Sequence, residues 1–137
     1  ELGFSIRLSC IMLKGFIDSI EEVSNLSRKA KEWNIEQLTI RSVRAPKHSE
    51  NNQVYSWTIE HELSDGQLLD LSKFLEKNGN RLMTLDNGGI VYDLDGQNIC
   101  MTDCLTIKPN TEEVRQLIFF PDGHLRYDWQ YKGAILI

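Results

Sequence analysis

Polar and apolar residues alternate along three segments in the first two thirds of the chain, a pattern typical of half-buried β-strands. The segments are 4–13, 36–44 and 54–62, and the shorter run 81–85 is expected to form a further strand. The alternation is cleanest in the third segment, where Tyr55, Trp57 and Ile59 share one face. We therefore predict four strands here, with 54–62 as the third.

Two other segments repeat apolar residues every three or four positions, which is the spacing of a core-facing helix. The first begins at a cap provided by Asp18 or Ser19, with Glu21 or Glu22 three residues later at the spacing of a capping box. The second begins with Ser64 and Gln67, which have the spacing of a capping box, and it ends at 78–79, where Asn-Gly tolerates left-handed backbone. The pattern predicts two main helices.

In chain order, residues 4–85 spell β-α-β-β-α-β, the split β-α-β order of ferredoxin-like folds. The polar segment 45–53 would join the second and third strands as a hairpin loop. Further turn signals lie at 86–89, 95–96 and 121–123. Strand-like runs at 90–94, 99–101, 114–120 and 125–130 flank these turns. We therefore predict that antiparallel β-hairpins follow the split β-α-β unit, giving an α+β fold.

Length and composition are those of an ordinary globular domain. The chain has 137 residues, of which 41% are apolar and 26% charged, so we predict a single domain over 1–137. No uncharged apolar stretch approaches the ~18 residues that a membrane helix needs, so no membrane association is expected. Cys10, Cys100 and Cys104 lack a secreted disulfide pattern, which favours free thiols in a reducing cytoplasm.

Negative charge is concentrated between Glu60 and Asp103. This stretch has nine acidic and three basic residues, a local charge of −6 against −5 for the chain. An acidic surface favours cationic partners and disfavours nucleic acid, which is bound through lysine and arginine. Aromatic residues ringed by acids are typical of protein-binding hot spots. The predicted partner-binding residues are Glu60, Glu62, Asp93, Asp95, Trp57 and Tyr92.

The sequence offers little for catalysis. His48, His61 and His124 are scattered, and no serine or cysteine nucleophile lies in an elbow-type context. Only His61 lies directly between two acids, so a small hydrolase that uses it remains an outside alternative. We predict surface histidines, no catalytic residue and no enzymatic activity.

Metal and cofactor motifs are incomplete. Residues 93–96 resemble the start of a calcium loop, but Gln97 stands where an oxygen ligand belongs and Cys104 replaces the closing glutamate. Glycine patterns that cradle phosphate are absent. We expect the acidic pairs Glu60/Glu62 and Asp93/Asp95 to lie on charged, solvent-facing strand faces. We predict no metal and no cofactor.

The small, acidic, motif-free design has short hairpins such as Phe119-Phe120-Pro121-Asp122-Gly123-His124-Leu125-Arg126-Tyr127-Asp128-Trp129. In this overall style the chain resembles bacterial toxin-immunity proteins, those of contact-dependent growth inhibition systems being the nearest comparison. The resemblance implies a cytoplasmic protein that neutralises one cognate toxin, such as a nuclease with a basic surface. It implies binding at the toxin's active site or partner site.

A second resemblance follows from the predicted order of elements. The β-α-β-β-α-β pattern is similar to that of ACT-like regulatory domains, which bind small metabolites at subunit interfaces. The alternative function is therefore a metabolite-sensing or regulatory interaction domain.

Overall fold

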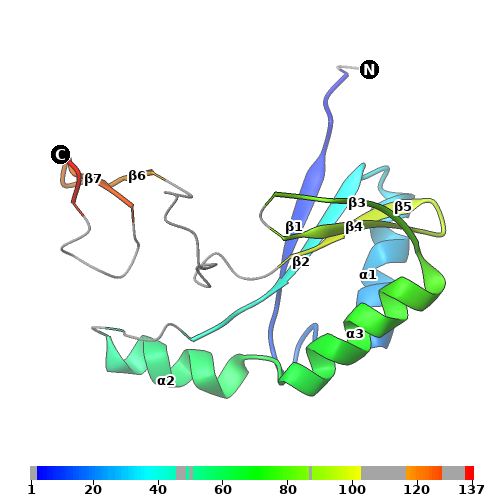
Figure 1. Cartoon of the computed structure of the whole chain (residues 1–137), viewed down its shortest axis with the longest axis horizontal. Helices are drawn as coiled ribbons and strands as arrows, with labels where there is room; N and C mark the ends of the chain where they lie inside the picture. Colours follow the sequence, from blue (N-terminus) through cyan, green and yellow to red (C-terminus); the bar gives the residue numbers. More distant parts are fainter. Residues whose placement is uncertain (1–2, 46–48, 50, 87, 103–116, 128–134) are drawn as a thin grey trace.

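A computed structural model of the chain describes residues 3–45, 49, 51–86, 88–102, 117–127 and 135–137 (Figure 1). The elements are β1 (Arg7–Met12), α1 (Ile20–Glu32), β2 (Gln37–Ser42), α2 (Asn52–His61), α3 (Asp65–Asn78), β3 (Asn80–Thr84), β4 (Ile90–Leu94), β5 (Gln97–Met101), β6 (Ile118–Phe119) and β7 (Leu125–Arg126). The predicted α+β class is confirmed.

The main sheet is mixed, and its strand order is β1-β2-β5-β4-β3. β1, β2 and β5 run parallel, whereas β4 is antiparallel to both β5 and β3. β6 and β7 pair in a separate two-stranded sheet, which lies apart from the main sheet in Figure 1. β2 is thus an interior strand with a parallel neighbour on each edge.

α1 and α3 cover one face of the main sheet and contact each other. α1 packs on β2 and β5, and α3 packs on β4. The core between them consists of Met12, Val23, Ala30, Leu38, Ile40, Leu63, Leu71, Leu75, Tyr92, Leu94 and Ile99. Alternate strand residues supply the sheet side of this core, as expected for a sheet with one helix-covered face.

The start of α1 is the predicted capping box. The Ser19 hydroxyl accepts a hydrogen bond from the Glu22 amide, and the Glu22 carboxylate accepts from the Ser19 amide. The same carboxylate also accepts from the Asp18 amide at 2.9 Å. These contacts satisfy amides that the helix leaves without intrahelical partners.

The start of α3 is also the predicted capping box, made by Ser64 and Gln67. Leu63, immediately before the cap, is fully buried in the core and fixes the direction in which the chain enters the helix. The Gln67 side-chain amide donates to the Asp18 carbonyl oxygen at 3.2 Å. The beginnings of α1 and α3 are therefore tied together.

The prediction of a third strand at 54–62 is wrong, because these residues form most of helix α2. Asn51 caps the helix by accepting from the Gln53 and Val54 amides, both at 3.1 Å. As the hairpin partner predicted for the second strand, it would need an edge of β2, but β1 and β5 occupy both edges. The β-branched and aromatic residues that favoured a strand are overridden by the cap and by this pairing.

The observed order over 4–85 is therefore β-α-β-α-α-β, with three helices in the described residues instead of two. The split β-α-β order, on which the comparison with ACT-like domains depended, is not the order of this fold. Most other predicted elements within the described residues are confirmed, with small shifts at their ends.

The hairpin predictions hold where the structure describes the chain. Asp95 and Gly96 both have positive φ, 52° and 81°, as a tight turn between β4 and β5 requires. Gly123 has a φ of 87° in the turn between β6 and β7. The predicted strand residues at 114–116 and 128–130 lie outside the described residues.

Replacing Ser64 by alanine should lower the free energy of unfolding by about 1 kcal/mol, because the cap of α3 loses its acceptor. Urea unfolding followed by circular dichroism measures this change. The matched control is Ser56→Ala, at an exposed position inside α2. Equal losses in both variants would show that the cap of α3 contributes nothing.

Glu22 should make stability depend on pH. Hydrogen bonds, the one from the Asp18 amide first, hold the pKa of its carboxyl below the ordinary value of 4.5. A lowered folded-state pKa gives a contribution that is present above 4.5 and is lost as pH falls through the folded-state pKa.

The variant Glu22→Gln keeps a hydrogen-bond acceptor and removes the charge. The difference in unfolding free energy between wild type and this variant should be largest near neutral pH and shrink in acid. Glu21→Gln, an exposed neighbour, is the control. A difference that stays constant across the pH range would contradict this role of Glu22.

Candidate functional site

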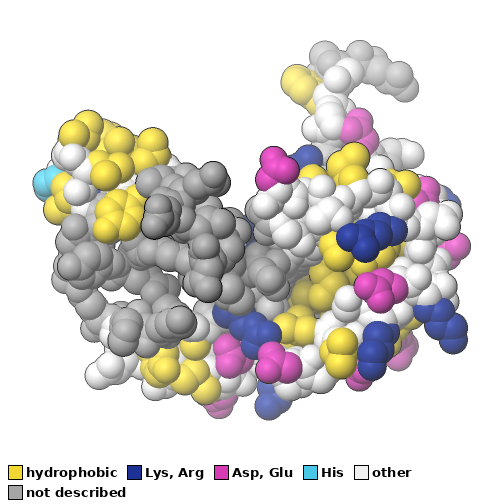
Figure 2. All heavy atoms as spheres, viewed as in Figure 1, with side chains coloured by type: hydrophobic (Ala, Val, Ile, Leu, Met, Phe, Trp, Pro, Cys, Tyr) yellow, Lys and Arg dark blue, Asp and Glu magenta, His cyan; other side chains and the backbone are white. Residues whose placement is uncertain are grey.

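α2 leaves several apolar side chains exposed to solvent. Val54 is 57% exposed, Trp57 47% and Ile59 48%, whereas Thr58 is the buried residue of this helix. Figure 2 shows hydrophobic side chains gathered at the lower left, where Figure 1 places α2. Val54 and Trp57, three positions apart, lie on one side of the helix, whereas Ile59, two positions from Trp57, points to another side. Neighbouring exposed apolar side chains on a helix are typical of an interaction surface.

The C-terminal end of α2 is fixed to the rest of the fold. The Lys14 amide, just after β1, donates to the His61 carbonyl oxygen at 2.8 Å. Leu63, two residues further on, is buried in the core. The helix is therefore held where it ends, while Val54 and Trp57 stay exposed.

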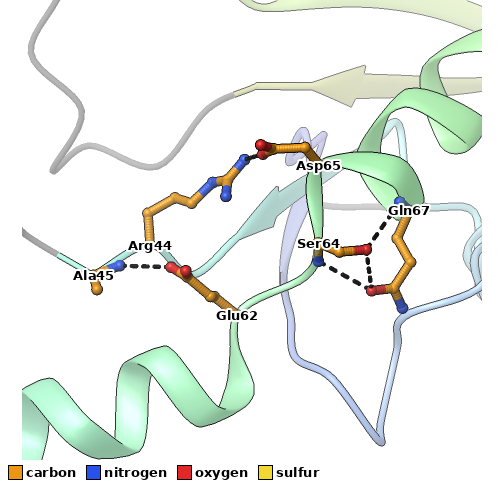
Figure 3. Close-up of polar contacts among 6 residues, drawn as sticks. All are labelled: Arg44, Ala45, Glu62, Ser64, Asp65 and Gln67. Atoms are coloured by element: carbon orange, nitrogen blue, oxygen red, sulfur yellow. Dashed lines mark hydrogen bonds and ion pairs between the residues drawn. The ribbon is translucent and has the colours of Figure 1, made fainter.

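A polar clamp also joins the segment after β2 to the junction between α2 and α3 (Figure 3). The Glu62 carboxylate accepts a hydrogen bond from the Ala45 amide at 3.0 Å. The Arg44 guanidinium contacts the Asp65 carboxylate at 2.7 Å. We call these two contacts the junction clamp; it holds both ends of the α2 segment together.

Trp57 lies, together with Val54 and Glu60, on the side of α2 that we call its outward face. Its helical neighbours at i−3 and i+3 are Val54 and Glu60, both exposed. The His61 ring stacks on the Trp57 indole with centroids 4.3 Å apart and an angle of 16° between the rings. The His61 Nδ1 atom lies 2.8 Å from the Trp57 carbonyl oxygen. These contacts restrict the rotation of the Trp57 indole.

The structure separates the two predicted acidic pairs. Glu60 and Glu62 do not share a strand face: Glu60 is an exposed helical residue and Glu62 is half-buried in the junction clamp. Their unequal exposure follows from the helix, in which residues two apart point to different sides. Of this pair, Glu60 alone lies beside Trp57 on the outward face.

Asp93 and Asp95 lie at the other end of the sheet. α2 follows the carboxyl end of β2, whereas the turn at 95–96 precedes β5, which runs parallel to β2. The Asp93 carboxylate accepts from the Gly96 amide at 2.6 Å and so stabilises that turn. The Lys31 ammonium group donates to the Asp95 carbonyl oxygen. Charges adjacent in sequence therefore do not form one acidic face.

Tyr92 is 1% exposed and belongs to the core, so it is not a surface anchor. The alternation of β4 directs Ile90, Tyr92 and Leu94 toward the helices. Its prediction as a partner-contacting residue fails for this reason. Conversely, Val54 and Ile59 were not predicted as site residues. The signal that could have found them is Asn51, a residue type that favours the N-cap of a helix and so predicts a helix in place of a strand.

The histidines are not assembled into a catalytic group within the described residues. His61 contacts Trp57. The His124 Nδ1 atom lies 3.3 Å from the Asp122 carboxylate, far along the chain in the small hairpin. A hydrogen bond from the His124 amide is the main cause that lowers the pKa of Asp122. His48 lies outside the described residues.

The described cysteines are free thiols on opposite faces of the main sheet. Cys10 lies against the core, whereas Cys100 follows the core residue Ile99 and points away from the helices. Burial raises the pKa of both thiols, which opposes formation of a nucleophilic thiolate. Cys104 lies outside the described residues. Within the described ranges, no three histidine, cysteine or acidic side chains are grouped to hold a metal ion.

In the described part of the chain, none of the helices is long and apolar enough to span a membrane.

Comparison with known proteins assigns no family to this chain. The chain matches no family model, no curated protein and no solved structure.

Proposed function

We propose that this chain is a non-enzymatic inhibitor that binds another protein through the outward face of α2. One observation carries the proposal: an anchored helix presents Val54 and Trp57 to solvent on one side. Burying such side chains in a partner is favourable, at roughly 25 cal/mol per Å² of apolar surface removed from water.

The mode of binding that fits this helix is insertion into a groove. Helices bound in this way present anchors at i, i+3, i+4 and i+7. Val54, Trp57 and His61 have this spacing, and Trp57 is the residue type most enriched at binding hot spots. The partner is expected to offer an apolar groove that receives the indole.

The negative charge of this chain indicates which charge the partner should carry around its groove. Glu60 is exposed beside Trp57, and the chain carries a net charge of −5. Complementary charge accelerates association, so a basic rim around the groove is favoured. A nuclease has such a surface because its cleft must bind phosphate.

These features support the immunity-protein hypothesis. In this proposal the chain acts in the cytoplasm, binds one cognate toxin with a basic surface and covers the toxin's active site or partner site. It performs no chemistry of its own. Isolation of the tagged chain from lysate of its source organism would supply the toxin, provided that the captured protein is basic and stoichiometric.

With purified toxin, Trp57→Ala should weaken binding about 30-fold, which corresponds to about 2 kcal/mol for a hot-spot aromatic. Titration calorimetry measures the dissociation constant, and thermal unfolding verifies that the variant is folded. Ile17→Ala, at a half-buried position outside α2, is the control for a general effect of apolar truncation. An unchanged dissociation constant for Trp57→Ala would exclude α2 as the contact surface.

Charge reversal at Glu60 should act mainly on the association rate. Glu60→Lys is expected to slow association about tenfold or more at low salt, and the difference from wild type should shrink as salt screens the charges. Glu32→Lys, at the exposed end of α1, makes the same charge change away from α2. Equal slowing in both variants, measured by stopped flow, would mean that net charge matters and the α2 face does not.

A further inference from the structure

The face of the main sheet opposite α1 and α3 carries Arg7 on β1 and Arg41 on β2. Leu8, Leu38 and Ile40 point toward the helices and belong to the core or pack against it, so their strand neighbours point to the opposite face. Arg7 is exposed and Arg41 is half-buried. Because the chain has a net charge of −5, two arginines on one face make a local exception to its acidic character.

The strand register places hydroxyl groups between the two arginines. β1 and β2 lie side by side, and Ser9 is aligned with Thr39 in their parallel pairing (Figure 1). Arg7 lies two residues before Ser9, and Arg41 lies two residues after Thr39. Two residues of a strand span about 7 Å, which an extended arginine side chain covers. Ser9 is exposed and Thr39 is buried, so the Ser9 hydroxyl is the one open to a ligand.

The electrostatics of Cys100 indicate that both guanidinium groups lie near the middle of this face. Cys100 of β5 is aligned with Thr39 and points away from the helices. Burial raises the pKa of the Cys100 thiol, and the positive charges of Arg7 and Arg41 both act in the opposite direction. Because the effect of a charge weakens with distance, the two arginines approach the same part of the sheet from different strands.

Neither arginine side chain has an anionic partner in the part of the chain that the structure describes. No ion pair or side-chain hydrogen bond joins Arg7 or Arg41 to another described residue. The Arg41 Nε atom is buried and lacks a hydrogen-bond partner. Asp93, an acid on the same face of β4, accepts from the Gly96 amide instead. Two neighbouring cations repel each other, so an anion bound between them is favourable.

We propose that this face binds the phosphate group of a small phosphate monoester, held between Arg7 and Arg41 with the Ser9 hydroxyl as a further donor. A guanidinium group donates paired hydrogen bonds to phosphate or carboxylate oxygens. The two arginines approach from opposite directions, and a tetrahedral phosphate offers oxygens to both, whereas a carboxylate presents its two oxygens on one side. The site does not depend on the proposed toxin contact, because its residues belong to β1 and β2 and not to α2.

Phenyl phosphate and benzoate are the matched probes, since they differ in a phosphate against a carboxylate on the same ring. Each is titrated into the full chain at constant ionic strength, and the NMR shifts of the Ser9 and Thr39 amides give both dissociation constants. Phenyl phosphate should bind about tenfold more tightly than benzoate, because both guanidinium groups donate to it.

Substitutions of arginine make the result specific. Arg7→Gln and Arg41→Gln should each weaken phenyl phosphate about fivefold or more, because one paired contact is lost. Arg41→Lys keeps the charge and removes the planar donor group, so it should also bind more weakly than wild type. Arg28→Gln, at an exposed position of α1, makes the same charge change away from the site and should leave the constant nearly unchanged. Retained melting temperatures show that the variants are folded.

The proposal is overturned if phenyl phosphate gives no saturable shift at Ser9 or Thr39 in wild type, or if benzoate binds as tightly. It is also overturned if Arg28→Gln weakens binding as much as Arg7→Gln and Arg41→Gln do, because net charge would then explain the effect. Tighter binding of inorganic phosphate than of phenyl phosphate would overturn the assignment to a monoester. None of these outcomes affects the test of the α2 face, which uses a protein partner.

Discussion

The position of β2 between two parallel neighbours is the constraint on which the rest of the fold depends. Leu38 and Ile40 of this strand are completely buried, and both of its edges are paired. Parallel neighbours cannot be joined by a tight turn, so each must be connected by a crossover. α1 supplies the first crossover. The second runs through α2, α3, β3 and β4, and its length leaves room for a helix outside the core.

Short sequence motifs correctly predicted the features that depend on neighbouring residues, namely the helix caps and a tight turn. Both capping boxes and the Asp95-Gly96 hairpin involve residues within four positions of one another, and each has the predicted form. The pairing of β5 with β2 joins segments about sixty residues apart, and no short pattern encodes it. The error at 54–62 follows from this, because the hairpin predicted for this segment needed an edge of β2 and both edges are paired with β1 and β5.

The candidate site was also predictable only in part, because residue type is a local property whereas exposure depends on the whole fold. Residue type alone predicted Trp57 and Glu60 as surface residues, and both are exposed. Exposure itself is set by tertiary packing, which buries Tyr92 and turns Val54 outward. The acidic cluster was continuous in sequence but is divided between the two ends of a sheet, because each β-strand carries the chain from one end to the other.

The junction clamp has a consequence for how this chain can diversify. Two contacts join the two ends of the α2 segment: Arg44 with Asp65, and Ala45 with Glu62. The helix is therefore held to the fold by contacts outside the hydrophobic core. Its outward residues contribute nothing to the core, and substitutions there are free of the packing constraints that act on α1 and α3. The outward residues of this helix can therefore change while the packing of α1 and α3 on the sheet stays the same.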